Sequence, residues 1–198
     1  MSVDPTKIHQ GPGNLWLNLS VPTTGNRMLI NASGVPTEGS PVDAGAIEGA
    51  ITLALGAKMD TIDADQLGGP VDAVMTGETD SIEVTMKESD LAKLRYFLQH
   101  GTYSTGTDAG LPGGAQAYEE IAFGGIMPIP KMSVAAISRR RDSTTKHVVS
   151  QLYSAIQMEA IALPYSRDKA TTYKVKFQGL NIATRPVGDQ VGKIYRQT

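Results

Sequence analysis

The residues best suited to chemistry are few and far apart. The chain of 198 residues contains three histidines, His9, His100 and His147, and no cysteine. No two of these histidines have the i, i+4 spacing with which a helix presents metal ligands on one face. The absence of cysteine excludes disulfides, thiolate nucleophiles and cysteine-ligated zinc. Because no nucleophile, base and orienting group can be assembled from these residues, we expect no catalytic site and no metal site at the histidines.

Carboxylates form a denser group further along the chain. Asp60, Asp63 and Asp65 lie close together in the sequence, and Asp72 follows them. The group lacks the glycine and the later glutamate of a calcium-binding loop. Two interpretations stay open, an acidic loop in solvent and an acidic lining within an assembly.

One segment has a superficial similarity to a phosphate-binding loop. Residues 188–193 read GDQVGK, with one residue too few between the glycines and with Ile194 where a serine or threonine is needed. The chain also lacks a Gly-x-Ser-x-Gly nucleophile elbow and a Gly-x-Gly-x-x-Gly dinucleotide motif. We therefore predict a protein that is not an enzyme and that binds no cofactor.

Two further features suit contacts between proteins. Arg139, Arg140 and Arg141 form a basic run, which is either a solvated rim or a docking point for an acidic patch on another subunit. Trp16 is the one tryptophan, and it is out of phase with the leucines beside it. It either covers a second sheet face or anchors an interface.

Charge is divided unevenly along the chain, although the net charge is only −2. Residues 1–120 carry 16 acidic and 6 basic side chains, whereas residues 121–198 carry 4 acidic and 12 basic ones. The split is either ordinary surface patterning or a pair of faces of opposite sign, and such faces favour head-to-tail association of identical copies.

The positions of the apolar residues predict a mostly β chain. Alternation of apolar and polar residues, typical of half-buried strands, recurs in several segments; these are 15–21, 46–55, 82–86 and 171–177. A helix is a rival for 46–55, but Gly49 weakens it. The run 147–163 is apolar on both faces, which indicates a strand covered on two sides or by a neighbouring subunit.

One helix is expected at about 89–100, with Ser89 as its N-cap and Gly101 at its end. The fold class is therefore a β-sandwich or barrel of seven to nine strands, flanked by this short α-helix and carrying long mobile loops and arms. We expect an N-terminal arm at 1–14, one domain at 15–180 with a long loop at 101–120, and a C-terminal tail or final edge strand at 181–198.

In residues 62–98, an acidic turn with Pro-x-Asp and a Thr-Gly-Glu hairpin precede an alternating strand and a short helix. This arrangement resembles tail tube and related tail proteins of long-tailed, siphovirus-like bacteriophages, and the resemblance covers about half of the chain. Residues 156–164 and 172–177 are similar to the closing strand pair of that family.

The resemblance implies a virion protein that is assembled in the bacterial cytoplasm. Its partners would be copies of itself in hexameric rings, which stack head to tail into a hollow tube, together with other tail proteins and genome DNA in passage. The acidic residues would then line the lumen or a ring edge, where they repel phosphates and let DNA slide; they are Asp60, Asp63, Asp65 and Asp72. Arg139 to Arg141 and Trp16 would contact neighbouring subunits.

Two other classes remain open. One is another virion part of similar fold, such as a tail terminator, a distal tail protein or a capsid decoration protein. The other is a β-sandwich module that binds glycans or peptides, although aromatic residues make up only 6% of the chain. We expect no membrane anchor, because no run approaches the roughly 18 apolar residues of a membrane span and the N-terminus does not resemble a signal peptide.

Overall fold

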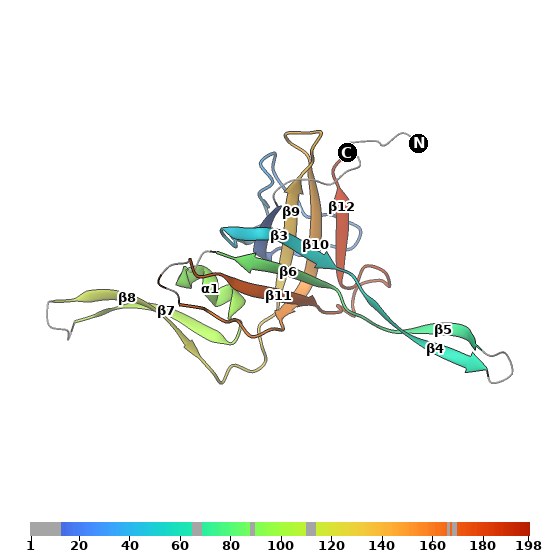
Figure 1. The fold of residues 1–198 in the computed structure, drawn as a ribbon. Helices are drawn as coiled ribbons and strands as arrows, with labels where there is room; N and C mark the ends of the chain where they lie inside the picture. The colour runs from blue at the N-terminus through green and yellow to red at the C-terminus, as the bar shows by residue number, and fades with distance from the viewer. Residues whose placement is uncertain (1–12, 65–68, 88–89, 110–113, 166, 168–169) are drawn as a thin grey trace.

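The computed structural model describes residues 13–64, 69–87, 90–109, 114–165, 167 and 170–198. The described chain is mostly β with a single short helix, as the sequence predicts (Figure 1). Its elements are β1 (Gly13–Leu19), β2 (Gly39–Asp43), β3 (Ile47–Ala54), β4 (Ala57–Ala64), β5 (Gly69–Glu78), β6 (Ser81–Met86), α1 (Leu91–Phe97), β7 (Gly101–Asp108), β8 (Gln116–Phe123), β9 (Met132–Arg139), β10 (His147–Gln157), β11 (Tyr173–Gly179) and β12 (Gly192–Arg196).

The body is a sandwich built from one sheet that changes layer. Its strands follow the order β2-β1-β9-β10-β11-β6-β3, and β12 pairs with β10. Strand β10 pairs with β12 over Val148–Leu152 and then with β11 from Ala155 to Gln157. Its register with β9 shifts between Leu152 and Ala155, so the strand turns from one layer into the other at an irregularity. In Figure 1, β9, β10 and β12 accordingly run across the direction of β3, β6 and β11.

The main core lies between these layers and under the helix. Strands β6 and β11 supply register partners that are all buried, namely Ile82 with Phe177, Val84 with Val175 and Met86 with Tyr173. The ring of Phe97 from α1 packs edge-on against Tyr173, with centroids 5.9 Å apart, and against Phe177 at 6.1 Å. The helix therefore seals one face of the sheet, as its apolar stripe predicts.

A second, smaller core lies on the other face of β1, β9 and β10. Trp16, Leu19, Ile137 and Val149 pack there against the segment 28–35. Strict alternation over 15–21 predicts that Leu19 shares a face with Leu15 and Leu17, and this is wrong, because Leu19 belongs to the second core and the other two to the main core. Asn18 has a φ of 55°, and the pairing of β1 with β2 shifts register between Leu17 and Leu19. This irregularity moves Leu19 to the face of Trp16.

Residues 147–157 of the predicted run 147–163 form β10, which is apolar on both faces, as expected, whereas residues 158–163 lie beyond the end of the strand. Leu152 belongs to the main core, whereas Val149 belongs to the second core. Both faces are covered within the chain, so this strand needs no neighbouring subunit to bury it.

The helix is shorter than predicted and begins at a different cap. It spans Leu91–Phe97, and the side chain of Asp90 accepts a hydrogen bond from the backbone N–H of Ala92 at 2.9 Å. Ser89, the expected cap, lies outside the described residues. Gly101, the expected end of the helix, instead begins β7, and three residues separate it from Phe97.

The largest correction concerns residues 101–120, which the glycine content predicts to be a loop. They form most of an antiparallel hairpin made of β7 and β8. The two strands pair without a register shift, from Gly101 opposite Phe123 to Asp108 opposite Gln116. Threonine and tyrosine at the paired positions favour strand, and Tyr118 covers Gly106, where a Cβ atom would lie 2.5 Å from the phenol oxygen. The glycine thus makes room for a cross-strand aromatic side chain.

Both ends of the described chain contain a strand where the sequence predicts an N-terminal arm and a C-terminal tail or edge strand. Strand β1 begins at Gly13, within the expected arm 1–14, whose first twelve residues lie outside the described part. At the other end, β12 pairs with β10 inside the segment 181–198, so the alternative of a final edge strand describes this segment.

Candidate assembly surface

Two hairpins project from opposite sides of the sandwich (Figure 1). Strands β4 and β5 form one hairpin, and β7 and β8 form the other; each is a separate two-stranded sheet. No described side chain of either hairpin is fully buried. A two-stranded sheet in water is marginally stable by itself, because it buries little apolar area and leaves both edges unpaired.

The hairpin β4–β5 presents apolar and acidic side chains to solvent. Met59 and Met75 are register partners and share one face. On the other face Asp60 pairs with Val74, and Ile62 pairs with Asp72. The four apolar side chains are each about half exposed. Exposed apolar side chains in such number are typical of a surface that another molecule covers.

The structure brings three of the four predicted acidic residues onto this hairpin. Asp60 and Asp63 lie on β4 and Asp72 lies on β5, whereas Asp65 lies outside the described residues. Asp60 and Asp72 are diagonal neighbours on one face, and both are exposed. Residues 57–78 contain five acidic side chains and one basic one, Lys58. The hairpin therefore carries a negative potential that repels polyanions and attracts basic surfaces.

The hairpin β7–β8 contacts the body near its base, and the rest of it is exposed to solvent. Ile121 packs against the main core, and the guanidinium of Arg95 in α1 lies 5.1 Å from the ring centre of Tyr103. Further out, the Ser104 hydroxyl donates a hydrogen bond to Glu120 at 2.7 Å. Phe123 is 71% exposed and Tyr118 is also exposed. The body thus orients this hairpin through Ile121 and Tyr103, while Tyr118 and Phe123 face solvent.

The arginine run does not act as one patch. The Arg140 side chain forms an ion pair with Asp142 and donates a hydrogen bond to the backbone carbonyl of Gln197. The hydrogen bond from Arg140 lowers the pKa of the Asp142 carboxyl. Arg139 and Arg141 are exposed on either side. The central arginine therefore holds the β9–β10 turn to Gln197, the residue that follows the last strand, rather than facing a partner.

Trp16 and the histidines are placed as structural residues. Trp16 is only 8% exposed within the second core, a position that fits a cover for the second face rather than an interface anchor. His147 is buried, His100 is exposed, and His9 lies outside the described residues. Within the described ranges, no group of three or more histidine, aspartate or glutamate side chains has an arrangement that could hold a metal ion.

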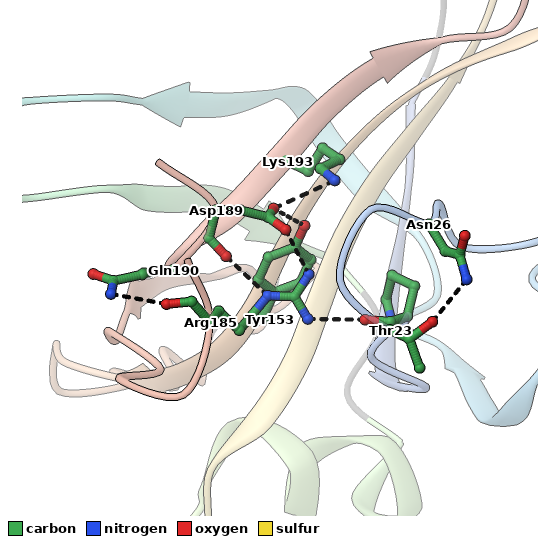
Figure 2. A network of polar contacts seen from close by, with 8 residues as sticks. Thr23, Asn26, Tyr153, Arg185, Asp189, Gln190 and Lys193 are labelled. Atoms are coloured by element: carbon green, nitrogen blue, oxygen red, sulfur yellow. Dashed lines mark hydrogen bonds and ion pairs between the residues drawn. The ribbon is translucent and has the colours of Figure 1, made fainter. Parts of the chain in front are cut away.

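The segment that resembles a phosphate loop instead forms a buried polar network (Figure 2). Arg185 donates hydrogen bonds to the Asp189 carbonyl and carboxylate at 2.8 and 2.9 Å, and to the Pro22 carbonyl at 2.8 Å. Its guanidinium lies 4.0 Å from the ring centre of Tyr153. The Tyr153 hydroxyl donates to Asp189 at 2.7 Å, and Lys193 lies 3.4 Å from the same carboxylate.

This network ties the C-terminal segment to β10 and to the loop that follows β1. Burial, followed by the contact with Asp189, raises the pKa of Tyr153 to about 12. The hydrogen bond from Tyr153, followed by those from Arg185 and Lys193, lowers the pKa of Asp189. Sequence reasoning missed Arg185 because an arginine in a polar segment usually faces solvent. The i, i+4 spacing of Arg185 and Asp189 was the one available signal.

Neither a protein-family model nor a curated protein sequence matches this chain. The described helix is seven residues long, which is far below the length needed to cross a bilayer. The arguments about function therefore rest on the two hairpins, their charge and their exposed apolar side chains.

Proposed function

We propose that this chain is a structural subunit that assembles with copies of itself, and that the assembly is a phage tail tube. In this proposal hexameric rings stack head to tail into a hollow conduit for genome DNA. The observation that carries it is the pair of hairpins on opposite sides of one body, each lacking a core of its own and each exposing apolar side chains.

The physical argument begins with the unpaired strand edges. A hairpin that extends beyond its own body gains stability when a neighbouring copy pairs with its edge or covers its apolar face. Two such hairpins pointing in opposite directions give each copy a neighbour on either side. Contacts between unlike surfaces close into a ring or continue as a filament, depending on the rotation between neighbours.

The acidic face of β4–β5 supports a conduit rather than a nucleic-acid binder. Asp60 and Asp72 share that face and have no described ion-pair partner. A lumen lined by such carboxylates repels phosphates, so DNA passes without being held. A basic lining would bind DNA in a salt-dependent way and slow its passage.

Sedimentation velocity over a wide range of protein concentration, followed by negative-stain microscopy, tests the proposal. We expect hollow rings or tubes at high concentration. A particle that stays monomeric at every concentration would contradict the proposal. A ring that never stacks, or a trimer, would instead favour another virion part of similar fold.

A further inference from the structure

A groove with a basic rim lies at the end of the body where β12 meets the segment 20–30. It has a volume of about 1000 Å³. Arg27, Lys146 and Arg196 line it, and Glu38 is the acidic residue in its described lining. Leu29, which is 58% exposed, adds an apolar wall. The groove therefore combines a net positive charge with apolar surface.

The cations of this groove, Arg27, Lys146 and Arg196, form no ion pair with a described residue, although Arg196 lies close enough to Asp142 for their charges to interact. The nearby arginine run does not supply the same site, because the Arg140 side chain is engaged by Asp142. An anionic partner with apolar side chains would satisfy both properties of the groove.

The hairpin β7–β8 has the complementary properties. Residues 101–123 contain three acidic side chains and neither lysine nor arginine. Glu119 and Glu120 form no ion pair with a described residue; Tyr118 is exposed beside them, and Phe123 is exposed at the base of the hairpin. In Figure 1 this hairpin points away from β12, so the hairpin and the groove of one copy do not meet.

We propose that the β7–β8 hairpin of one copy docks in the basic groove of the next copy. The inference rests on the proposed function, since it names the surfaces through which copies of the chain associate. A second copy fits the groove better than a nucleic acid does, because the hairpin brings aromatic side chains to the apolar wall as well as carboxylates to the cations. The contact joins unlike surfaces, so it can repeat from copy to copy.

Site-specific crosslinking tests this contact, and the absence of cysteine from the chain makes every introduced thiol unique. A Tyr118→Cys variant is mixed with a Leu29→Cys variant and oxidised. We expect a crosslinked dimer, and we expect a ladder of longer species when both substitutions are placed in one chain. The control replaces Leu29→Cys by Val187→Cys, because Val187 is 94% exposed but lies outside the groove. Crosslinking to this control measures random collision.

Charge reversal provides the second arm. Glu119→Lys with Glu120→Lys should weaken association roughly tenfold or more, and Arg27→Glu with Arg196→Glu should do the same. Mixing the two reversed proteins should restore association between them. Glu48→Lys, an exposed reversal on β3, serves as the matched control and should leave association unchanged.

The outcomes separate this inference from the proposed function. If wild-type protein assembles but crosslinking at Leu29 does not exceed that at Val187, the docking contact is wrong and the proposed function stands. If the crosslink forms in an assembly that is neither ring nor tube, the contact is right and the tube is wrong. Absence of both assembly and crosslinking overturns both. Loss of short-duplex DNA binding on groove reversal, with crosslinking unchanged, would assign the groove to nucleic acid and refute the contact.

Discussion

The buried network around Arg185 allows one prediction whose size follows from the structure. Arg185→Met keeps an apolar stem but removes three hydrogen bonds of 2.8 to 2.9 Å, one of them to a carboxylate. The Arg185 side chain is 8% exposed and that of Asp189 is 15% exposed, so this pair is largely shielded from water. Breaking a buried ion pair by removing one partner typically costs about 3–5 kcal/mol of the free energy of unfolding.

The lower end of that range applies here. Asp189 keeps the hydrogen bond from Tyr153 and the ion pair with Lys193, so its charge is not left without partners. The Pro22 carbonyl, by contrast, loses its donor. We therefore expect Arg185→Met to lower the free energy of unfolding by about 3 kcal/mol.

Urea unfolding measures this change, and Trp16 provides a buried fluorescent probe. The matched control is Lys174→Met, which removes an ion pair to Glu83 of 3.6 Å between side chains that are 70% and 39% exposed. Such a surface pair contributes about 0–1 kcal/mol. The slope of free energy against urea should stay the same in both variants. A loss for Arg185→Met no larger than that for Lys174→Met would refute the reasoning.

Three further predictions follow from other features. Replacing residues 57–78 by an Asn-Gly turn should change the free energy of unfolding by no more than about 1 kcal/mol, because no described core residue lies there. The same replacement should abolish assembly, which sedimentation velocity measures. The pKa of Asp189 is lowered in the folded state, so the stabilisation that its charge provides is present above the unfolded pKa near 4 and is lost as pH falls. In the Asp189→Asn variant, the free energy of unfolding measured in urea should therefore fall less steeply as the pH drops below about 4. Asn18→Val should cost about 1–2 kcal/mol in the same assay, because φ is 55° there, whereas Asn18→Gly should cost less.

The strands of the body could be predicted because each has one face in a core. In β6, for example, Ile82, Val84 and Met86 are buried and alternate with less buried residues. Burial of one face imposes a period of two on the sequence, and that period is visible without a structure. The helix was visible for the same reason, since Leu94 and Phe97 lie on its buried face.

The hairpins could not be predicted at their full length because neither of their faces enters a core. In β8, the residues from Gln116 to Glu120 are all exposed, so nothing selects an alternating pattern. In β5 the sequence pattern predicts a short strand over 71–75 alone, whereas β5 spans Gly69–Glu78. Cross-strand pairing holds these segments, and pairing leaves a weaker signal in the sequence than burial does.

The polar network escaped prediction for a different reason. One acceptor of Arg185 is the backbone carbonyl of Pro22, which is 163 positions away in the chain. A carbonyl is present at every residue, so the sequence does not indicate which of them an arginine will meet. Asp60, Asp63 and Asp72 lie near one another in the sequence, but the sequence does not indicate that they share one projecting hairpin, which follows from the register of β4 with β5.

The way in which β4–β5 joins the body determines how the molecule would respond to mechanical load. Strand β3 continues into β4 after two residues, and β5 continues into β6 after two residues. A pull on the hairpin tip therefore acts along β3 and β6, which are hydrogen-bonded to each other, and β6 is also hydrogen-bonded to β11. Because β3 and β6 are pulled in the same direction, the load passes into the body through the β6–β11 hydrogen bonds, which lie perpendicular to the strands and are sheared together instead of being broken one after another. The joint should resist tension better than its two-stranded width suggests.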